Sequence, residues 1–385
     1  MSKGKFLIIT ANRFPTGDAG AVRLRAFASI LNDLNYQPVV VCMGESTDFS
    51  KRIYENVEYY SLRYRSDHIL FRMLGRVLYT ANLKKTIKVF KSEIKGILID
   101  SCNMSTLSFV KKTARKLGIT PIYDSVEWYS ECEFKNGARN ISYRWNNALN
   151  TKLIDNQFKV IAISSFLEKH FSDRGIETIR IPVIMDIDSM PNLTQQKADN
   201  SKIKIVYAGS MGKKDHIQEM LDGLSLLSDE ERSRILFCVI GITKEQYEAY
   251  HGKIPSEIEE SVSFKGRITR EEVLEHLASA DFSFLLRPSQ ERYAKAGFPT
   301  KSVEALSSGV PMLCNYSSDL DRYLTDKENS IIISECSAEA CADALKRALI
   351  LSWDELCSLR VNARKTAEEN FDWRLYQESL KQILN

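Results

Sequence analysis

The chain has 385 residues, 44% of them hydrophobic, and its 53 Lys and Arg residues against 50 Asp and Glu give a net charge of +3. This length favours two folded domains, and the balanced charge excludes a general attraction to nucleic acid. The N-terminus passes from MSKGK directly into the apolar run FLIIT. No apolar stretch approaches the roughly 20 residues of a membrane span. We therefore expect a cytoplasmic protein that acts free or at a membrane surface.

Metal and disulfide chemistry is not favoured by the cysteines, histidines and acidic pairs. The eight cysteines form no CxxC pair, and several lie inside apolar runs such as ILFCVIG and PMLCN, which predicts buried free thiols. The five histidines have no ligand spacing, so we expect no structural zinc. DxD matches occur at 186–188 and 319–321. The second opens a helix, where acids commonly cap, and neither is predicted to bind a metal.

Short β-branched runs alternate with helical patterns along the whole chain. The first series has strands near 5–10, 38–43, 57–62, 97–101, 120–124 and 159–163, and the second begins with KIKIVYAG and continues through RILFCVIG, VSFKG, DFSFLL, PMLCN and SIIIS. This alternation predicts an α/β protein with two parallel sheets. We expect domains at 1–190 and 203–371, a polar linker at 191–202 and a terminal helix at 372–385 that packs back on the first domain. Ligand sites should follow the carboxyl ends of the strands.

Two glycine-bearing loops of the second half precede helices that begin with lysines. Gly209 ends a strand, and GSMGKKD carries Lys213 and Lys214 to the next helix start. In 296–312, Pro299 suits a first helical position and Lys301 falls in the first turn. A cation there opposes the helix dipole unless an anion neutralises it. Two such places suggest a shared diphosphate, although solvated surface lysines would give the same pattern.

One turn beyond Lys301, Glu304 could accept both hydroxyls of a ribose through its two oxygens. An acidic residue near a helix start is also stabilised by the dipole, so spacing leaves both interpretations open. In the first half, Asp124 and Glu127 in YDSVEWYS end an apolar strand. That acidic pair could orient an acceptor hydroxyl or only bond its own loop.

These motifs resemble family-four, GT-B glycosyltransferases. The second half matches in YAGSMGKKD, FKGRITREEVLEHLASADFSFLLRPS and GFPTKSVEALSSGVPML, and the first in its glycine loop after strand one, YDSVEWYS and KVIAISSFLEKHF. The resemblance covers nearly the whole chain. It implies two Rossmann-like, doubly wound parallel-sheet domains facing a cleft, and a hexosyltransferase-type enzyme of bacterial surface polysaccharide biosynthesis. Such an enzyme would move sugar from a UDP- or GDP-linked donor to a saccharide or lipid-linked acceptor, with retention and without metal or cofactor.

The resemblance also implies roles for particular residues. Lys214, with Arg287 or Lys301, would hold the diphosphate and stabilise charge on the leaving group, and Glu304 would bind the ribose. The family's first glutamate would fall at Ala296, where this sequence departs from the pattern. We take Lys214, Lys301, Glu304 and Glu127 as the catalytic candidates. The donor-binding candidates are Gly17, Gly20, Gly209, Ser210, Lys213, Gly266, Arg267, Ile268, Arg287, Gly297, Phe298, Pro299 and Thr300.

The segment 69–95 combines apolar residues at helical spacing with a basic face. It carries seven basic residues against one acid, Glu93. This pattern predicts either a domain helix with a solvated basic face or a contact with anionic lipid at the inner face of the cell membrane.

Three other classes of protein compete with a glycosyltransferase. A nicotinamide-dependent oxidoreductase is disfavoured because the loop ANRFPTGDAGAV is long and has no GxGxxG. A phosphorylase is disfavoured because the chain is short for the cofactor-bearing phosphorylases of this fold and has no extended segment that could bind their cofactor. A non-catalytic GT-B protein that only binds a nucleotide or sugar stays open because of Ala296.

Overall fold

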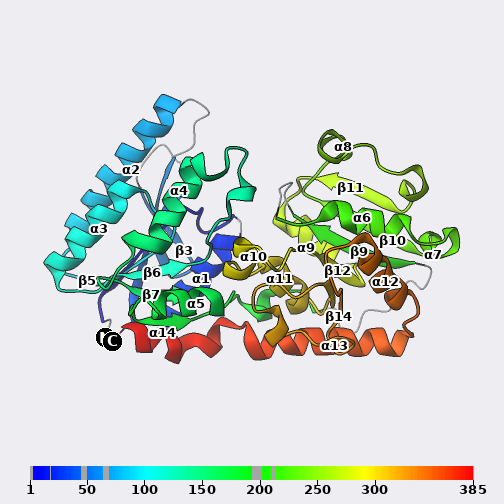
Figure 1. Ribbon diagram of the computed structural model, residues 1–385. Coiled ribbons are helices and arrows are strands. Elements are labelled where there is room, and N and C mark those ends of the chain that lie inside the picture. The colour runs from blue at the N-terminus through cyan, green and yellow to red at the C-terminus, as the bar shows by residue number, and fades with distance from the viewer. Residues whose placement is uncertain are drawn as a thin grey trace. The chain divides into compact units, whose positions relative to one another are not determined.

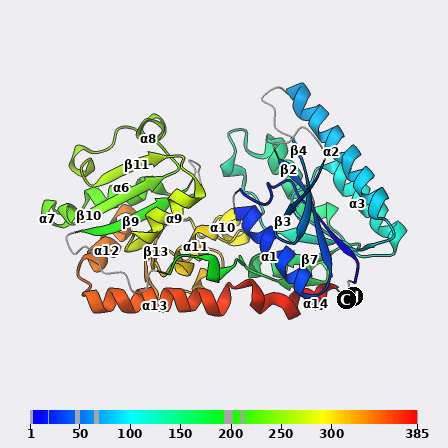
Figure 2. The ribbon, with the colours of Figure 1, turned by 180° about the vertical axis from the view of Figure 1, so that it is seen from behind.

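The computed structural model of the protein describes residues 3–17, 19–44, 50–63, 69–192, 202–209 and 214–384, except the side chains of 44, 62–63 and 69–78. The chain divides into two compact units (Figures 1 and 2). Unit 1 is formed by Met1–Glu127, Asn147–Asp186 and Asp372–Asn385, and unit 2 by Trp128–Asn146 and Ile187–Phe371.

Unit 1 is built on an eight-stranded sheet with the strand order β3-β4-β2-β1-β5-β6-β7-β8. Only β3 runs antiparallel, against β4. The order reverses direction between β1 and β5, which makes the carboxyl ends of these two strands the switch point of the sheet. The strands are β1 (Lys5–Ile9), β2 (Gln37–Gly44), β3 (Lys51–Tyr54), β4 (Val57–Arg63), β5 (Ile94–Ile99), β6 (Ile122–Ser125), β7 (Lys159–Ala162) and β8 (Thr178–Arg180).

The helices of unit 1 cover this sheet and bring the C-terminus back to it. Phe27 and Ile30 of α1 pack with Leu380 and Ile383 of α14 in one core cluster with the strands. Helices α2 and α3 lie side by side in both views (Figures 1 and 2). The helical segments are α1 (Ala19–Asp33), α2 (Ile69–Phe90), α3 (Met104–Leu117), α5 (Ser165–Ser172), the 3₁₀ turn η7 (Trp373–Tyr376) and α14 (Gln377–Leu384).

Unit 2 is built on a six-stranded parallel sheet with the order β11-β10-β9-β12-β13-β14. Its switch point lies between β9 and β12. The strands are β9 (Ile203–Ala208), β10 (Ile235–Ile240), β11 (Val262–Gly266), β12 (Phe282–Leu285), β13 (Met312–Cys314) and β14 (Ser330–Ile332). Their alternation with helices follows from the repeated change between apolar β-branched runs and helical patterns.

The helices of unit 2 pack on its sheet around a large core cluster. It includes Met220 of α6 and Leu345 of α12, and these two helices meet at Gly223. A Cβ added there would lie 2.6 Å from Cys341 Cβ, so only glycine allows this approach. The helices are α6 (Ile217–Ser225), α7 (Asp229–Ser233), α8 (Lys244–His251), α9 (Arg270–Ala278), α10 (Arg292–Ala296), α11 (Thr300–Ser307), α12 (Ala338–Leu349) and α13 (Trp353–Asn370).

The chain passes between the units in two ways. Residues 186–187 and 371–372 are adjacent crossings, because Met185 and Asp372 form a parallel bridge and the Trp373 amide donates to the Met185 carbonyl at 3.1 Å. A second excursion, 128–146, leaves unit 1 after β6 and packs in unit 2. It carries most of α4 (Ile141–Ala148). The sequence-based boundary at 190 had placed this excursion with the first half.

The expected α/β architecture with two parallel sheets is confirmed, and every expected strand has a counterpart. Two short strands, β3 and β8, were not expected, because each has only three or four residues and half-buried or exposed side chains. The cysteines are all free thiols, but Cys132 is exposed, which corrects the expectation of burial at that position. None of the described helices combines the length and the apolarity needed to cross a membrane.

Candidate functional site

The carboxyl ends of β9, β12 and β13 bring together the polar groups of unit 2. Tyr207 lies in β9 and Asp215 in the loop that follows it, while Arg287 follows β12 and Asn315 follows β13. The Asn315 side chain fixes the Arg287 backbone from both sides, accepting from its amide at 2.9 Å and donating to its carbonyl at 2.6 Å. The cluster therefore lies at the switch point of this sheet, where open α/β sheets bind ligands.

Asp215 is the centre of this cluster. Its carboxylate accepts from Arg287 Nε at 2.6 Å, from the Lys301 ammonium and from the Tyr207 hydroxyl at 3.0 Å. Burial opposes ionisation of Asp215, but the charges of Lys301 and Arg287 outweigh it and hold the pKa of Asp215 well below its usual range. Two cations share one carboxylate, so the cluster carries one excess positive charge. An anionic ligand would neutralise it.

Gly209 leaves room for Lys301 to approach the backbone closely. A Cβ on Gly209 would lie 2.7 Å from Lys301 Nζ and would collide with the Tyr207 hydroxyl. The ammonium also lies 4.6 Å from the centroid of the Tyr207 ring, a cation–π contact. Burial lowers the pKa of Lys301, an effect that Asp215 partly reverses. The glycine expected from the sequence to admit a ligand thus also admits the lysine to the backbone.

Glu304 lies one turn beyond Lys301 on α11. One of its oxygens accepts from Arg270 Nη1 at 2.5 Å, and its side chain is 16% exposed. Arg270 is the first residue of α9, and only the N-cap residue Thr269 separates it from the segment Gly266, Arg267 and Ile268. Gly266 has a φ of 64°, in the left-handed region that favours glycine. The structure thus joins the loop expected to meet a nucleotide base to the glutamate expected to bind ribose.

Lys214 lies apart from the Asp215 cluster. Its ammonium pairs with Glu133 at 3.2 Å and lies 5.2 Å from the Tyr129 ring centroid. Its carbonyl accepts from the Tyr293 hydroxyl at 3.1 Å. Lys214 therefore contacts the excursion 128–146, whereas Lys301 and Arg287 meet each other through Asp215. Ser210 and Lys213 lie outside the described residues.

Arg292, the first residue of α10, holds the excursion 128–146 against this helix. Arg292 lies 4.8 Å from the Trp128 ring centroid and donates to the Tyr129 carbonyl, through Nε at 3.1 Å. The Tyr293 amide donates to Ser130 Oγ at 3.2 Å. No sequence pattern announced this contact, because its partners are about 160 residues apart. The excursion thereby places Glu133 beside Lys214.

Two residues of the expected donor-binding set, Phe298 and Pro299, are buried in unit 2. Phe298 is 6% exposed and packs edge-on against Tyr323 and Phe371, with ring centroids 5.8 and 5.7 Å away. Pro299 is buried and precedes α11 as its N-cap, one residue before the expected first helical position. Gly297 is also buried, whereas Thr300, the first residue of α11, is half-buried. The assignment of this turn to donor binding stays a prediction.

The switch point of unit 1 holds a different polar group, centred on Asp100. Its Oδ2 accepts from Thr10 Oγ1 and from Asn12 Nδ2, both at 2.7 Å. Its buried Oδ1 has no hydrogen-bond partner among the described residues. A Cβ on Gly20 would come within 2.6 Å of the Asn12 side chain, so glycine lets Asn12 reach this place. Gly17 lies just before α1, beside Arg13. The only sequence signal for Asp100 was one acid ending the apolar run GILID.

Asp124 and Glu127, the acidic pair expected from the sequence, have different hydrogen-bond partners in the structure. Both oxygens of Asp124 accept from Arg23, each at 2.8 Å, in a pair that is nearly inaccessible to solvent. Arg23 also donates to the Ile181 carbonyl at 3.0 Å. Asp124 therefore ties α1 to β6. Glu127 is half-buried, and its carbonyl accepts from Asn150 Nδ2 at 3.2 Å.

The ionisation of Asp100 predicts a pH dependence of stability. Burial, reinforced by the charge of Asp124, raises the pKa of Asp100 to about 7. From about pH 4 to about pH 7 the folded protein retains a proton that the unfolded chain has lost, so the contribution of Asp100 to stability falls as pH rises. We expect Asp100→Asn to be more stabilising, relative to the wild type, at about pH 8 than at about pH 5 in urea unfolding. An equal difference at both pH values would contradict this prediction.

No group of three or more His, Cys, Asp and Glu side chains that could hold a metal ion occurs among the described residues. Of the DxD matches, Asp186 pairs with Arg374 at 3.2 Å. Asp319 is buried and makes no side-chain cap bond, contrary to the expected capping role.

The two doubly wound sheets define the GT-B class of glycosyltransferases. Residues 191–369, which include nearly all of the second sheet's unit, match the family model described as "Glycosyl transferases group 1". The match covers 179 of the 385 residues. No curated protein matches the chain in sequence.

Solved structures share the fold over the whole chain. Sucrose-phosphate synthase from Thermosynechococcus elongatus is 14% identical with a TM-score of 0.74, covering 99% of this chain and 98% of that one. Anabaena HepE in complex with UDP-glucose is 14% identical with a TM-score of 0.71, covering 98% and 99%. WaaG, a glycosyltransferase involved in lipopolysaccharide biosynthesis, is 16% identical with a TM-score of 0.68, covering 99% of each chain. At these identities the likeness is one of fold.

Proposed function

We propose that this protein transfers a hexose from a nucleotide diphosphate sugar, UDP- or GDP-linked, to a saccharide or lipid-linked acceptor. The observation that carries the proposal is the Asp215 cluster, where Lys301 and Arg287 share one carboxylate at the switch point of unit 2. Its excess positive charge suits a diphosphate, whose developing negative charge on departure these groups would stabilise. The UDP-glucose named with HepE supports a nucleotide sugar as the donor.

In this proposal the donor extends from the cluster toward α9. Glu304 Oε1 is already bonded to Arg270, while Oε2 has no partner among the described residues. That free oxygen would accept a hydrogen bond from one ribose hydroxyl, and the Arg270 guanidinium would donate one to the other. The loop 266–268 would contact the base. Lys214 would leave its ion pair with Glu133 and bind the donor phosphates. We also propose that the reaction proceeds with retention. It would need no metal, because the fixed cations supply the charge that a metal would otherwise provide.

Ala296, which stands where the family has its first glutamate, is buried among its neighbours. The Ala296 side chain is fully buried at the end of α10. A carboxylate there would have to displace its neighbours, so other groups would read the hydroxyls of the donor sugar. A glycosyl transfer assay then distinguishes the enzyme from a protein that binds the nucleotide without turnover.

On the acceptor side, we place the reacting hydroxyl near the switch point of unit 1. Asp100 and Asn12 are the polar groups at the carboxyl ends of β5 and β1 there. Glu127, two residues beyond β6, is the further candidate. A carboxylate in hydrogen-bond reach of an acceptor hydroxyl would orient it for attack.

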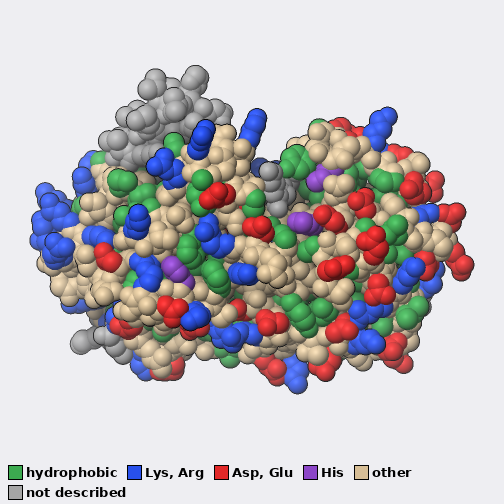
Figure 3. All heavy atoms as spheres, in the orientation of Figure 1, with side chains coloured by type: hydrophobic (Ala, Val, Ile, Leu, Met, Phe, Trp, Pro, Cys, Tyr) green, Lys and Arg blue, Asp and Glu red, His purple; other side chains and the backbone are tan. Residues whose placement is uncertain are grey.

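We further propose peripheral contact with anionic lipid at the inner face of the cell membrane. Lys84, Lys85, Lys88, Lys91 and Lys95 are exposed, and Figure 3 shows Lys and Arg side chains gathered where α2 and α3 end. The apolar residues between them, Leu83, Ile87, Phe90 and Ile94, are buried in unit 1. The contact would therefore be electrostatic rather than an insertion, and it would weaken with salt.

The experiment that tests the donor site is a thermal-shift and calorimetric comparison of UDP, GDP, ADP and CDP without divalent metal. We expect one nucleotide to stabilise the protein, and Glu304→Ala to weaken its binding about tenfold or more, because the Glu304 contact with a ribose hydroxyl is lost and Arg270 loses the carboxylate that holds it. Glu275→Ala, at an exposed and unpaired glutamate of α9, is the matched control and should bind normally. If folded protein binds none of the four nucleotides, the proposed function is wrong.

A further inference from the structure

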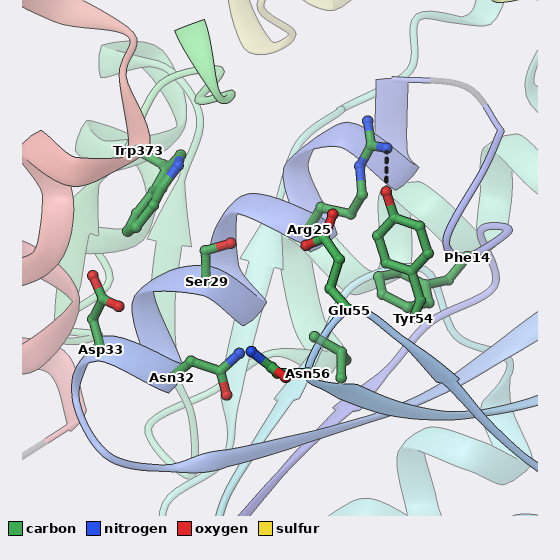
Figure 4. A pocket seen from close by; sticks show the side chains of 10 residues that line it. Phe14, Arg25, Ser29, Asn32, Asp33, Tyr54, Glu55, Asn56 and Trp373 are labelled. Carbon is green, nitrogen blue, oxygen red and sulfur yellow. Dashed lines mark hydrogen bonds between the residues drawn. The ribbon is translucent and has the colours of Figure 1, made fainter. Parts of the chain in front are cut away.

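A pocket of about 200 Å³ lies in unit 1, away from the switch point of that unit's sheet. One wall is a face of α1, from which Arg25, Ser29, Asn32 and Asp33 project. The turn between β3 and β4, residues 54–57, forms a second wall, and Phe14 and Trp373 complete the lining (Figure 4). The turn precedes β4, which is parallel to β2, so the pocket lies toward the amino ends of the strands. It is therefore separate from the polar groups at the carboxyl ends.

The pocket combines aromatic walls with hydrogen-bonding groups that nothing else uses. Ser29, Asn32, Glu55 and Asn56 have no side-chain partner among the described residues, and the two asparagine side chains point toward one another (Figure 4). Tyr54 is fixed by an edge-on contact with Phe14, at 6.1 Å between centroids. Across the pocket, Trp373 is half-buried.

These groups match the chemistry of one neutral sugar ring. Amide and hydroxyl groups both donate and accept, as sugar hydroxyls do, and a carboxylate accepts from two hydroxyls. Aromatic rings suit the C–H faces of a pyranose because the ring face carries negative partial charge. Arg25, Asp33 and Glu55 sum to one negative charge, which disfavours a phosphate or nucleotide.

We propose that this pocket is a second saccharide-binding site, which holds a neutral sugar residue of the acceptor chain away from its reacting end. This rests on the proposed function only in that the acceptor is a saccharide. Asn32 and Asn56 fix the sugar's hydroxyls, and Tyr54 and Trp373 flank its ring. Such a site would favour acceptors that already carry several sugars, because a second contact raises their effective concentration at the reacting site.

Saturation-transfer NMR with the methyl glycosides of glucose, galactose, mannose and N-acetylglucosamine tests the site directly. We expect at least one glycoside to bind, and the double variant Asn32→Ala, Asn56→Ala to bind it about tenfold more weakly or worse. Neither asparagine side chain has a hydrogen-bond partner among the described residues, so the variant should fold, which far-UV circular dichroism verifies. Asn156→Ala, at an exposed asparagine elsewhere in unit 1, is the matched control.

The same experiment separates this site from the donor site. Glycoside binding should persist in Glu304→Ala and in the presence of saturating nucleoside diphosphate, and the double variant should bind the nucleotide normally. Absence of binding by all four glycosides, undiminished binding in the double variant, or displacement by the nucleotide would each overturn the proposal. Failure of nucleotide binding alone would overturn the proposed function and leave this site standing.

Discussion

Lys301→Met should weaken nucleoside diphosphate binding by about a hundredfold and lower transfer by about a hundredfold to a thousandfold. The change removes one of the two cations that share Asp215 and leaves the cluster neutral. A diphosphate would then meet no excess positive charge in a largely covered site, where charges are poorly screened. Methionine retains the length and most of the volume of the side chain, so α11 should keep its packing.

The measurement is calorimetric titration with the best-binding nucleotide, followed by a transfer assay. Lys295→Met is the matched control, because Lys295 lies on α10 outside the cluster and has no side-chain partner among the described residues. It should bind and turn over normally. If folded Lys301→Met binds the nucleotide as tightly as the wild type does, the diphosphate does not occupy this cluster.

Asp215→Asn should have the opposite balance of effects, with a large loss of stability and retained nucleotide binding. Removing the carboxylate leaves Lys301 and Arg287 close together without compensation, which costs about 3–5 kcal/mol for a buried pair. The pKa of Asp215 lies below its usual range, so this stabilisation is present above the unfolded value near pH 4 and is lost as pH falls through the depressed pKa. The difference between variant and wild type should therefore persist at neutral pH.

A bound diphosphate should restore much of what Asp215→Asn removes, because it supplies negative charge to the two uncompensated cations. Thermal unfolding with and without nucleotide measures this: the nucleotide-induced shift should be larger in the variant than in the wild type. Asp343→Asn, at an exposed and unpaired aspartate of α12, is the control and should behave as the wild type. Equal nucleotide-induced shifts in the variant and the wild type would show that the ligand does not contact these cations.

The sequence predicted features that depend on local pattern. Runs such as KFLII and ILFCVI form strands because their β-branched and apolar side chains are buried on a sheet, and the intervening periodic segments form helices against it. The lysine of PTKSVE lies in the first turn of α11 as predicted, since the start of a helix after Gly and Pro is a local property. Fold class follows from such signals summed along the chain.

Only the tertiary structure decided which polar groups meet. Asp215 follows two lysines in sequence, yet it pairs with Arg287 and Lys301, which lie 72 and 86 residues away. Adjacent Lys214 instead bonds Glu133, from an excursion that sequence spacing had assigned to the other half. Electrostatic pairs depend on distance in space, and strand order brings the ends of β9 and β12 together although β10 and β11 separate them in the chain.

The same limit applies to the pocket of unit 1 and to Phe298. The pocket requires α1, the β3–β4 turn and Trp373 to converge, and β3 was too short and too exposed to be expected. Phe298 lies within a motif that implied ligand binding, but its neighbours are Tyr323 and Phe371. A sequence determines which segments are apolar enough to be buried. Which side chains face one another follows from how helices and strands pack, because packing must fill space with the residues of distant segments.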